Sequence, residues 1–330
     1  MKVALIGAGR NGGGHVHSLA VMDDVTIVGI ADPVLERAQE MAAEVGGSAY
    51  ADHRAMLDKE KPDAVWISSP CDLHADQTVD CARAGAHVHC EKPMALTLED
   101  CDRMVEAARD SGVKLMIGQS TRYSPGLVEA RRIYESGRCG ALVSAWSLRM
   151  SYHQAQPDVP WRLDGDRSGG IVFEWEVHEI DFVCSIGGSV SDVYARTACS
   201  RKEAPNFLDH FSAILTFEKG GYGNLEASQS CTLSMSGRGF VGTEGTVEVR
   251  GRNEVRIRQV GQEKPEVVTV PTDPHAEQGL GRMPQNADFV RAIREDDLSP
   301  IPGEDGRANI EIGLAIMESG RTGEVVKLPL

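Results

Sequence analysis

The sequence predicts an α/β protein of two domains, in which a doubly wound parallel sheet is followed by a mostly antiparallel sheet. Three observations lead to this fold class. The 330 residues exceed what one hydrophobic core usually holds. Residues 1–118 alternate short apolar runs with helical segments. Beyond residue 118, strand-like runs follow one another with few helices between them. We therefore place the two domains at residues 1–119 and 120–330.

Short apolar runs define the strands of the first domain, at residues 2–7, 25–31, 63–69, 87–90 and 114–118. Helices are expected between them, at residues 12–22, from Pro33 onward, from about residue 73 to Gly85, and from Thr97 to Gly112. Proline suits a first helical turn, threonine is a good N-cap, and glycine is common where helices end. Strands and helices in this alternation predict a parallel sheet with helices on both faces.

The second domain opens with a helix at residues 124–136 and a strand at 142–150, and one continuous helix is expected from Gly170 to Ile186. Further strands are expected at residues 211–217, 222–230, 246–250, 254–260 and 266–270. Helices at 284–294 and 305–319 and a strand at 325–328 complete the domain. Strands in succession favour antiparallel pairing.

Composition narrows the class of function. The net charge of −15 argues against a nucleic-acid or anionic-membrane partner. The first apolar run is short and broken by glycines, unlike a signal peptide or a membrane-spanning helix. The eight cysteines include no C-x-x-C pair, which argues against a zinc or disulfide framework and predicts no metal site. Reduced thiols indicate a cytoplasmic protein.

A dinucleotide fingerprint follows the first strand, where the sequence reads Gly7, Ala8, Gly9, Arg10, Asn11 and Gly12. In the G-x-G-x-x-G pattern the first glycine allows a tight turn, the second lets the backbone approach a pyrophosphate, and the third lets the helix pack on the strand. The N–H groups of the helix N-terminus then face the phosphates. This context predicts a Rossmann domain.

Asp32 lies 20 residues after Gly12, at the end of the second strand. A carboxylate there accepts hydrogen bonds from an adenosine ribose and repels a 2′-phosphate, so NAD is expected in preference to NADP. The alternative is a helix-capping aspartate before Pro33.

Dispersed motifs then appear in a characteristic order. They are Ser69-Pro70-x-x-Leu73-His74, Cys90-Glu91-Lys92-Pro93, Gly118 with Arg122-Tyr123-x-Pro125, Trp161-Arg162, Gly169-Gly170 and His178-x-x-Asp181. Together they resemble the Gfo/Idh/MocA family of oxidoreductases over essentially the whole chain. The resemblance implies a large, mostly antiparallel second sheet whose open face builds homodimers or homotetramers. It also implies NAD as cofactor and a sugar or polyol as substrate, oxidised or reduced at a ring carbon.

The resemblance further implies roles for individual residues. Lys92 is expected beside both the nicotinamide and the substrate. Cofactor contacts are expected from Ser69, Pro70, Leu73, His74, Glu91, Lys92, Ser120, Trp161 and Arg162. Ser120 stands where asparagine is frequent in the family, and His74 has the alternative of a structural residue at a helix start.

Glu174, His178 and Asp181 are spaced four and three residues apart, which would place them on one face of the helix expected there. A carboxylate beside an imidazole favours a base that removes a hydroxyl proton, so His178 and Glu174 are predicted to be catalytic. The resemblance adds Lys92 as the third predicted catalytic residue. The alternative is a solvated acidic face with one buried histidine. Glu174 and Glu176 stand where the family usually has aspartate and glycine. The predicted substrate-binding residues are Lys92, Tyr123, His153, Arg162, Trp175 and His178.

The function expected from this sequence is NAD-dependent hydride transfer to or from a secondary alcohol or ketone carbon of a sugar, glycoside or cyclitol. Two other functions stay open. One is an NAD-dependent enzyme that cleaves glycosides through transient oxidation, and the other is a non-catalytic NAD-binding regulator.

Overall fold

The structure is a computed structural model that describes residues 1–152, 160–272 and 281–330. The chain divides into two compact units. The first unit contains residues 1–119 and 273–308, and the second contains residues 120–272 and 309–330. Residues 273–308 thus cluster with the first unit, although the sequence reading assigned them to the second domain. Their return is held in part by a hydrogen bond from the Ile117 N–H to the Ile301 carbonyl, at 2.9 Å.

The first unit is built on a six-stranded sheet in the order β3-β2-β1-β4-β5-β6. Its strands are β1 (Lys2–Ile6), β2 (Thr26–Ala31), β3 (Ser48–Tyr50), β4 (Ala64–Ile67), β5 (His87–Glu91) and β6 (Leu115–Gly118). Every pairing is parallel, which confirms the doubly wound parallel sheet. The sequence reading did not anticipate β3, which is three residues long and lies at the edge of the sheet.

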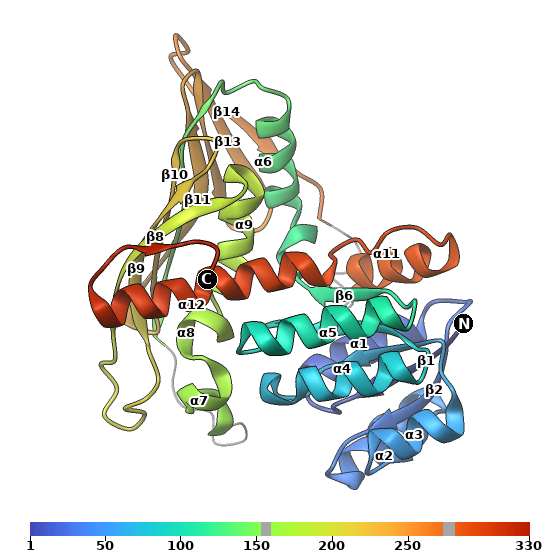
Figure 1. The fold of residues 1–330 in the computed structure, drawn as a ribbon. Helices are drawn as coiled ribbons and strands as arrows, with labels where there is room; N and C mark the ends of the chain where they lie inside the picture. Colours follow the sequence, from blue (N-terminus) through green and yellow to red (C-terminus); the bar gives the residue numbers. More distant parts are fainter. Residues whose placement is uncertain (153–159, 273–280) are drawn as a thin grey trace. The chain divides into compact units, whose positions relative to one another are not determined.

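Helices alternate with these strands (Figure 1). They are α1 (Arg10–Ala20), α2 (Leu35–Val45), α3 (His53–Glu60), the 3₁₀ turn η1 (Cys71–Leu73), α4 (His74–Arg83), α5 (Leu98–Asp110) and α11 (Met283–Arg294). The N-cap at Thr97 is confirmed, because its hydroxyl accepts the Asp100 N–H at 3.1 Å. All four residues of β4 are buried, as expected for a central parallel strand.

The second unit contains a nine-stranded sheet in the order β14-β13-β12-β11-β7-β10-β9-β8-β15. Its strands are β7 (Leu142–Tyr152), β8 (Val190–Ala198), β9 (His210–Phe217), β10 (Tyr222–Ser228), β11 (Ser230–Gly242), β12 (Gly245–Arg250), β13 (Glu254–Gln259), β14 (Glu266–Thr269) and β15 (Val326–Lys327). The pairing of β10 with β7 is parallel and the other pairings are antiparallel. The large, mostly antiparallel sheet is therefore confirmed, although β8 and β11 were not anticipated.

Helices of the second unit pack against this sheet, with α6 (Pro125–Glu135) and α9 (Val177–Gly187) lying along it (Figure 1). Shorter elements are η2 (Ser120–Tyr123), η3 (Pro160–Leu163), α7 (Gly165–Ser168) and α8 (Gly170–Glu174). The long helix α12 (Gly303–Thr322) begins in the first unit and continues into the second.

The prediction of one continuous helix from Gly170 to Ile186 is wrong, because the helix is interrupted between α8 and α9. The N–H groups of Trp175 and Glu176 both reach the Ile171 carbonyl, at 3.1 and 3.0 Å, which ends α8. Trp175 leaves helical geometry, and Glu176 is the N-cap of the new helix. Residues 174 and 178 therefore do not share one helical face, whereas His178 and Asp181 both belong to α9.

Candidate functional site

The glycine turn between β1 and α1 requires glycine for steric reasons. Gly7 has φ +97°, and a Cβ there would lie 2.7 Å from the Ser68 backbone. A Cβ on Gly12 would lie 2.1 Å from the Gly7 carbonyl oxygen. A Cβ on Gly9 would meet nothing within 4 Å, so open space adjoins the N-terminus of α1. Since Gly9 is the N-cap and gives no side-chain hydrogen bond, this turn fits a phosphate group placed against the helix.

Asp32 supports this turn from the end of β2. Its Oδ2 accepts the Ala8 N–H at 2.8 Å and its Oδ1 accepts the Val34 N–H at 2.9 Å. The residue is 8% exposed. A carboxylate has about four acceptor sites, so these two bonds leave capacity for ribose hydroxyls. Asp32 thus holds the backbone where α2 begins, and it also fits the role expected beside a nucleotide.

His74 joins the loops that follow β4 and β5. Its Nδ1 lies 2.9 Å from the Pro93 carbonyl oxygen and its Nε2 lies 3.0 Å from that of Ser69. Burial lowers the pKa of His74, against the opposing effect of these two carbonyl groups. The His74 side chain is 1% exposed, so its contacts are those of a structural histidine at a helix start, the alternative that the sequence left open. The neighbouring Leu73 is 43% exposed.

Glu91 holds the backbone of Lys92 in place. Its Oε2 accepts the Lys92 N–H at 3.2 Å, and its Oε1 lies 3.0 Å from both His15 Nε2 and Arg282 Nη1. Burial alone would raise the pKa of Glu91, but Arg282 and the hydrogen bond from His15 hold it well below its usual range. The carboxylate is therefore ionised in the folded protein. The half-buried Lys92 follows directly at the carboxyl end of β5.

Three residues of this arrangement were not singled out in the sequence: His15, Arg282 and Asn286. His15 is fully buried in α1, and its Nδ1 lies 2.8 Å from Asn286 Oδ1. The same oxygen accepts the Trp66 indole N–H at 3.0 Å. A histidine on the helix after the glycine motif was the available signal for His15. No local pattern marks Arg282 or Asn286, because their partners are distant in sequence.

In the second unit, the predicted catalytic residues Glu174 and His178 lie on opposite sides of the helix break. Glu174 Oε1 lies 3.3 Å from Arg162 Nε, and the Arg162 guanidinium lies 5.6 Å from the centre of the Trp161 ring. The half-buried His178 has its Nδ1 3.4 Å from the Thr121 hydroxyl. The structure thus brings Arg162 to Glu174, and it brings η2 to His178.

Asp181 links α9 to η2 and to the part of α12 that lies in the second unit. Its carboxylate accepts two N–H groups of Arg122, at 2.8 and 2.6 Å, and the Asn309 amide at 2.9 Å. Ser120 and Tyr123 lie in η2 beside Arg122, and the half-buried Trp175 lies at the helix break. His153 lies outside the described residues.

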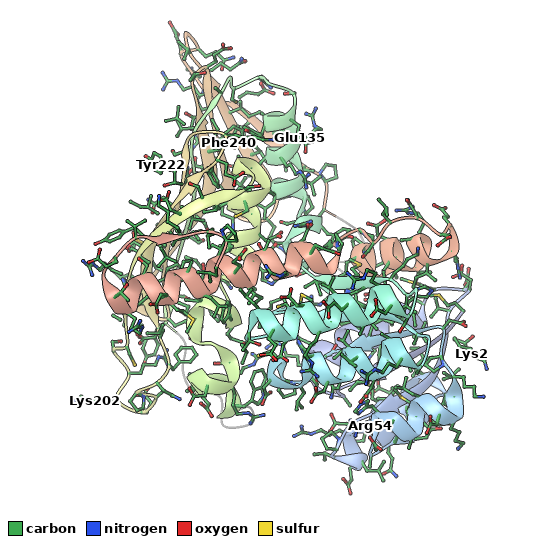
Figure 2. All side chains as sticks on the ribbon, in the orientation of Figure 1. Lys2, Arg54, Glu135, Lys202, Tyr222 and Phe240 are labelled. Carbon is green, nitrogen blue, oxygen red and sulfur yellow. The ribbon has the colours of Figure 1, made fainter. Side chains whose placement is uncertain are left out.

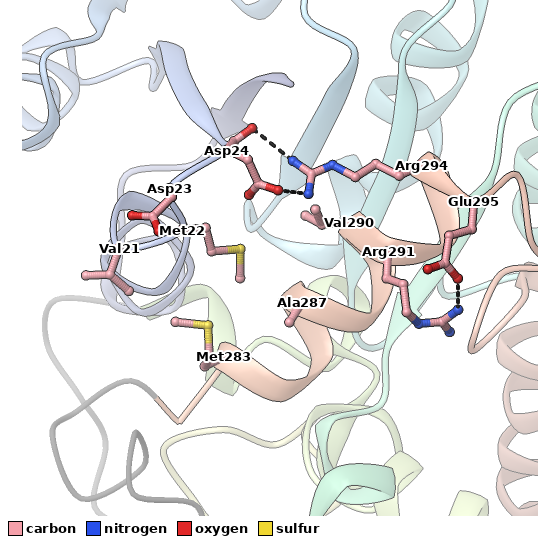
Figure 3. A pocket seen from close by; sticks show the side chains of 10 residues that line it. All are labelled: Val21, Met22, Asp23, Asp24, Met283, Ala287, Val290, Arg291, Arg294 and Glu295. Atoms are coloured by element: carbon pink, nitrogen blue, oxygen red, sulfur yellow. Dashed lines mark hydrogen bonds and ion pairs between the residues drawn. The ribbon is translucent and has the colours of Figure 1, made fainter.

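A surface hollow of about 620 Å³ lies elsewhere in the first unit, between the end of α1 and α11 (Figure 3). Its charged groups pair with one another, Arg294 with Asp24 and Arg291 with Glu295. It adjoins the C-terminal end of α1, about 16 Å from the glycine turn at the other end of the helix. The hollow is therefore not the nucleotide site. Within the described residues, no group of three or more His, Cys, Asp or Glu side chains could hold a metal ion.

Comparisons with known proteins identify the family of this chain. Residues 1–119 match the family described as an oxidoreductase family with an NAD-binding Rossmann fold, and residues 127–251 match the GFO/IDH/MocA C-terminal domain. The chain is thus an oxidoreductase with an NAD-binding Rossmann domain. It belongs to the GFO/IDH/MocA family.

Relatives of known name are similar over nearly their full length. Myo-inositol 2-dehydrogenase of Thermotoga maritima is 28% identical, with 99% of this chain and 98% of the relative covered. The 1,5-anhydro-D-fructose reductase of Ensifer adhaerens is 29% identical, with 98% and 94% covered. Among solved structures, this chain is similar to levoglucosan dehydrogenase in complex with NADH and levoglucosan. The two chains are 25% identical in sequence, the comparison covers 100% of each, and the TM-score is 0.90. Across the part of the chain described here, no helix is long and apolar enough to cross a membrane.

Proposed function

We propose that this protein transfers a hydride between NAD and a secondary alcohol or ketone carbon of a sugar, glycoside or cyclitol. One observation carries the proposal. The carboxyl edge of the six-stranded sheet bears the glycine turn, Asp32 and Lys92 together, after β1, β2 and β5. Ligands of open α/β sheets bind at this edge. The first unit then carries the cofactor, and the second unit carries substrate recognition and oligomerisation.

The cofactor would be held by Gly7, Gly9, Arg10, Asn11 and Gly12 at its pyrophosphate, with Asp32 at the adenosine ribose. The other residues proposed to contact it are Ser69, Pro70, Leu73, His74, Glu91, Lys92, Ser120, Trp161 and Arg162. Of these, Glu91 acts through the backbone of Lys92, given its burial. The nicotinamide, when bound, supplies the hydride acceptor or donor.

The protein's own groups handle the proton and the charge. The Lys92 ammonium stabilises negative charge on the substrate oxygen, an interaction that is stronger in the transition state than in the ground state. His178 takes the hydroxyl proton. Glu174 keeps its place among the proposed catalytic residues through its pairing with Arg162, because the helix break removes it from the face of α9 that carries His178. The pairing of Glu174 with Arg162 keeps that carboxylate in a defined place. Tyr123, His153, Arg162 and Trp175 are the proposed substrate contacts.

The substrate class follows from the relatives. Their names refer to inositol, anhydrofructose and levoglucosan, all of which are polyhydroxylated ring compounds. A hydroxylated ring of this kind offers secondary alcohols from which a base such as His178 can take a proton.

The open face of the nine-stranded sheet supports a homodimer or homotetramer. By strand register, one face carries Trp146, Leu148, Ile214, Tyr222 and Met235. Ile214, Tyr222 and Met235 are 49%, 45% and 49% exposed, whereas Phe240 on β11 is fully buried (Figure 2). An apolar sheet face of this kind marks an interaction site, and a second copy is its proposed occupant. The free cysteines of the described residues fit a reducing compartment, so we place the protein in the cytoplasm.

A panel of cyclitols, aldoses, glycosides and keto-sugars tests the function, with NADH followed by absorbance. Turnover of at least one polyol with NAD is expected. Cleavage of a glycoside without net NADH, with NAD retained through purification, would replace the proposal by glycoside cleavage. NAD binding without turnover of any compound would leave a regulatory protein.

A further inference from the structure

We propose that Arg149 is a positioning residue that holds the turn between α8 and α9, and through it His178 and Trp175. The inference rests on the proposed function of His178. It concerns residues of the second unit alone.

Arg149 reaches from β7 to the two residues at which the helix breaks. Its Nη1 donates to the Trp175 carbonyl at 3.3 Å. Its guanidinium carbon lies 4.4 Å from the centre of the Trp175 ring, within the range of a cation–π contact. The same Nη1 lies 3.7 Å from Glu176 Oε1. One side chain therefore contacts the backbone, the ring and the carboxylate of the turn.

The turn needs such a partner for a physical reason. Glu176 is 1% exposed, and a buried carboxylate is costly unless cations and hydrogen bonds compensate it. Glu176 is also the N-cap of α9, and its carbonyl accepts the N–H groups of Glu179 and Ile180, both at 2.9 Å. A displacement of Glu176 would therefore shift the first turn of α9.

A second buried carboxylate extends the same arrangement. Glu179 is fully buried, accepts the Ser147 hydroxyl at 2.7 Å and forms a two-point ion pair with Arg238. Arg149 Nη1 lies 3.8 Å from Glu179 Oε1. Burial alone would raise the pKa of Glu179, but Arg238 and Arg149 hold it below its usual value. Arg149 thus contacts an acid on either side of His178 in the first turn of α9.

These contacts assign Arg149 an effect on the reaction as well as on folding. His178 and Trp175 are proposed to meet the substrate, and their backbone is fixed by the residues that Arg149 binds. A misplacement of about 1 Å at a reacting group can cost about a hundredfold in rate. Replacement of Arg149 should therefore lower kcat even in protein that remains folded.

The test compares Arg149→Met and Arg149→Lys with the wild type on a substrate found in the panel. Arg149→Met should lower kcat about 10- to 100-fold and leave the Kd for NAD within about twofold. Arg149→Lys should recover part of the loss, since lysine keeps the charge and one hydrogen bond but lacks the planar stack. Hydrogen exchange of residues 175–181 should rise in Arg149→Met.

Arg196→Met is the matched control, because Arg196 lies on β8 with its guanidinium 5.3 Å from the Tyr194 ring. Its kinetics and the exchange of residues 175–181 should equal those of the wild type. The inference is overturned if Arg149→Met raises exchange or lowers Tm but keeps wild-type kcat and KM, since Arg149 would then be only structural. Unchanged exchange also overturns it. If His178→Asn remains fully active, the proposed function of His178 has failed instead, and this inference fails with it.

Discussion

The Asp32 carboxylate holds the backbone by accepting the N–H groups of Ala8 and Val34. We expect the same carboxylate to set the preference between NAD and NADP. We expect the wild type to prefer NAD over NADP by at least about tenfold, or about 1.4 kcal/mol, because a 2′-phosphate would approach a partly desolvated carboxylate. Asp32→Ser should narrow this gap and cost about 1–2 kcal/mol in the free energy of unfolding. Calorimetric titration with both nucleotides measures the preference.

The control for Asp32 is Asp52→Ser. Asp52 accepts the Arg54 N–H at 3.2 Å at the start of α3, so this variant makes the same substitution at a carboxylate that binds backbone N–H, without touching the glycine turn. Asp52→Ser should keep the nucleotide preference. Equal or tighter binding of NADP by the wild type would contradict the role given to Asp32.

Lys92 is expected to act mainly in the transition state. Lys92→Met should lower turnover roughly 10²–10³-fold with little change in NAD affinity. Lys114→Met is a matched control, because Lys114 pairs with Asp296 at 2.8 Å in the same unit. It should keep wild-type turnover. A Lys92→Met enzyme with more than half of the wild-type kcat would remove Lys92 from the mechanism.

His178 must be neutral to accept a hydroxyl proton. Alcohol oxidation should therefore rise with pH as the imidazole loses its proton, and then level off. His178→Asn should flatten this rise and lower oxidation about 10²–10⁴-fold, and Glu174→Gln should cost less. The exposed His17→Asn, which loses only a pair with Glu44, is the control. If His178→Asn lowers Tm but the folded enzyme stays active, His178 is structural.

Among the secondary-structure elements, the turn between β1 and α1 contains two glycines, Gly9 and Gly12, whose substitution should have different effects on stability and on NAD binding. Gly12→Ala should destabilise the protein, because its Cβ would lie 2.1 Å from the Gly7 oxygen. Gly9→Ala should leave stability near that of the wild type, since its Cβ meets nothing within 4 Å, but should weaken NAD binding by filling the space expected for phosphate. Thermal unfolding and NAD titration measure both effects.

Gly13→Ala is the control for this unit. Its Cβ would lie 3.8 Å from Met41 Cε, an ordinary contact, so the change should be neutral or stabilise the helix by up to about 1 kcal/mol. NAD affinity should not change. A Gly9→Ala protein that binds NAD as tightly as the wild type would show that the phosphates lie elsewhere.

At the scale of the whole molecule, buried titratable groups make stability depend on pH. His89 is fully buried with its pKa well below 6.5, chiefly through burial, and neither ring nitrogen has a hydrogen-bond partner among the described residues. Its unfolded form binds a proton near pH 6.5 while the folded form does not, so stability falls as pH drops below about 7. Glu91, with its depressed pKa, adds a second loss as pH falls below about 4.3.

His89→Phe tests this linkage. The ring stacks on Trp66 at 5.8 Å and meets Phe289 edge-on at 6.0 Å, so an apolar aromatic fits its surroundings. Urea unfolding between pH 5 and 8 should show a smaller acid loss in the variant and a gain of about 1 kcal/mol at pH 6. An unchanged slope between pH 7 and 5 would contradict the assignment to His89.

Features that depend on local geometry could be predicted from the amino-acid sequence. Gly7 and Gly12 are required by a positive φ and by close backbone approach, Thr97 by an exposed helix N-terminus, and the parallel sheet by buried apolar runs of strand length. Such requirements act within a few residues, so the fold class and the presence of an NAD-binding Rossmann domain can be predicted from the pattern alone.

Features held by contacts between segments distant in sequence could not be predicted in this way. Residues 273–308 return to the first unit, and Arg282 and Asn286 reach Glu91 and His15 across separations that leave no periodic signal. The helix break after Glu174 escaped prediction because apolar residues continue on both sides of it, while the arginine that binds the turn comes from β7. A local pattern shows which residues favour a helix, but it does not show that an arginine from a distant strand will contact the turn at which α8 ends.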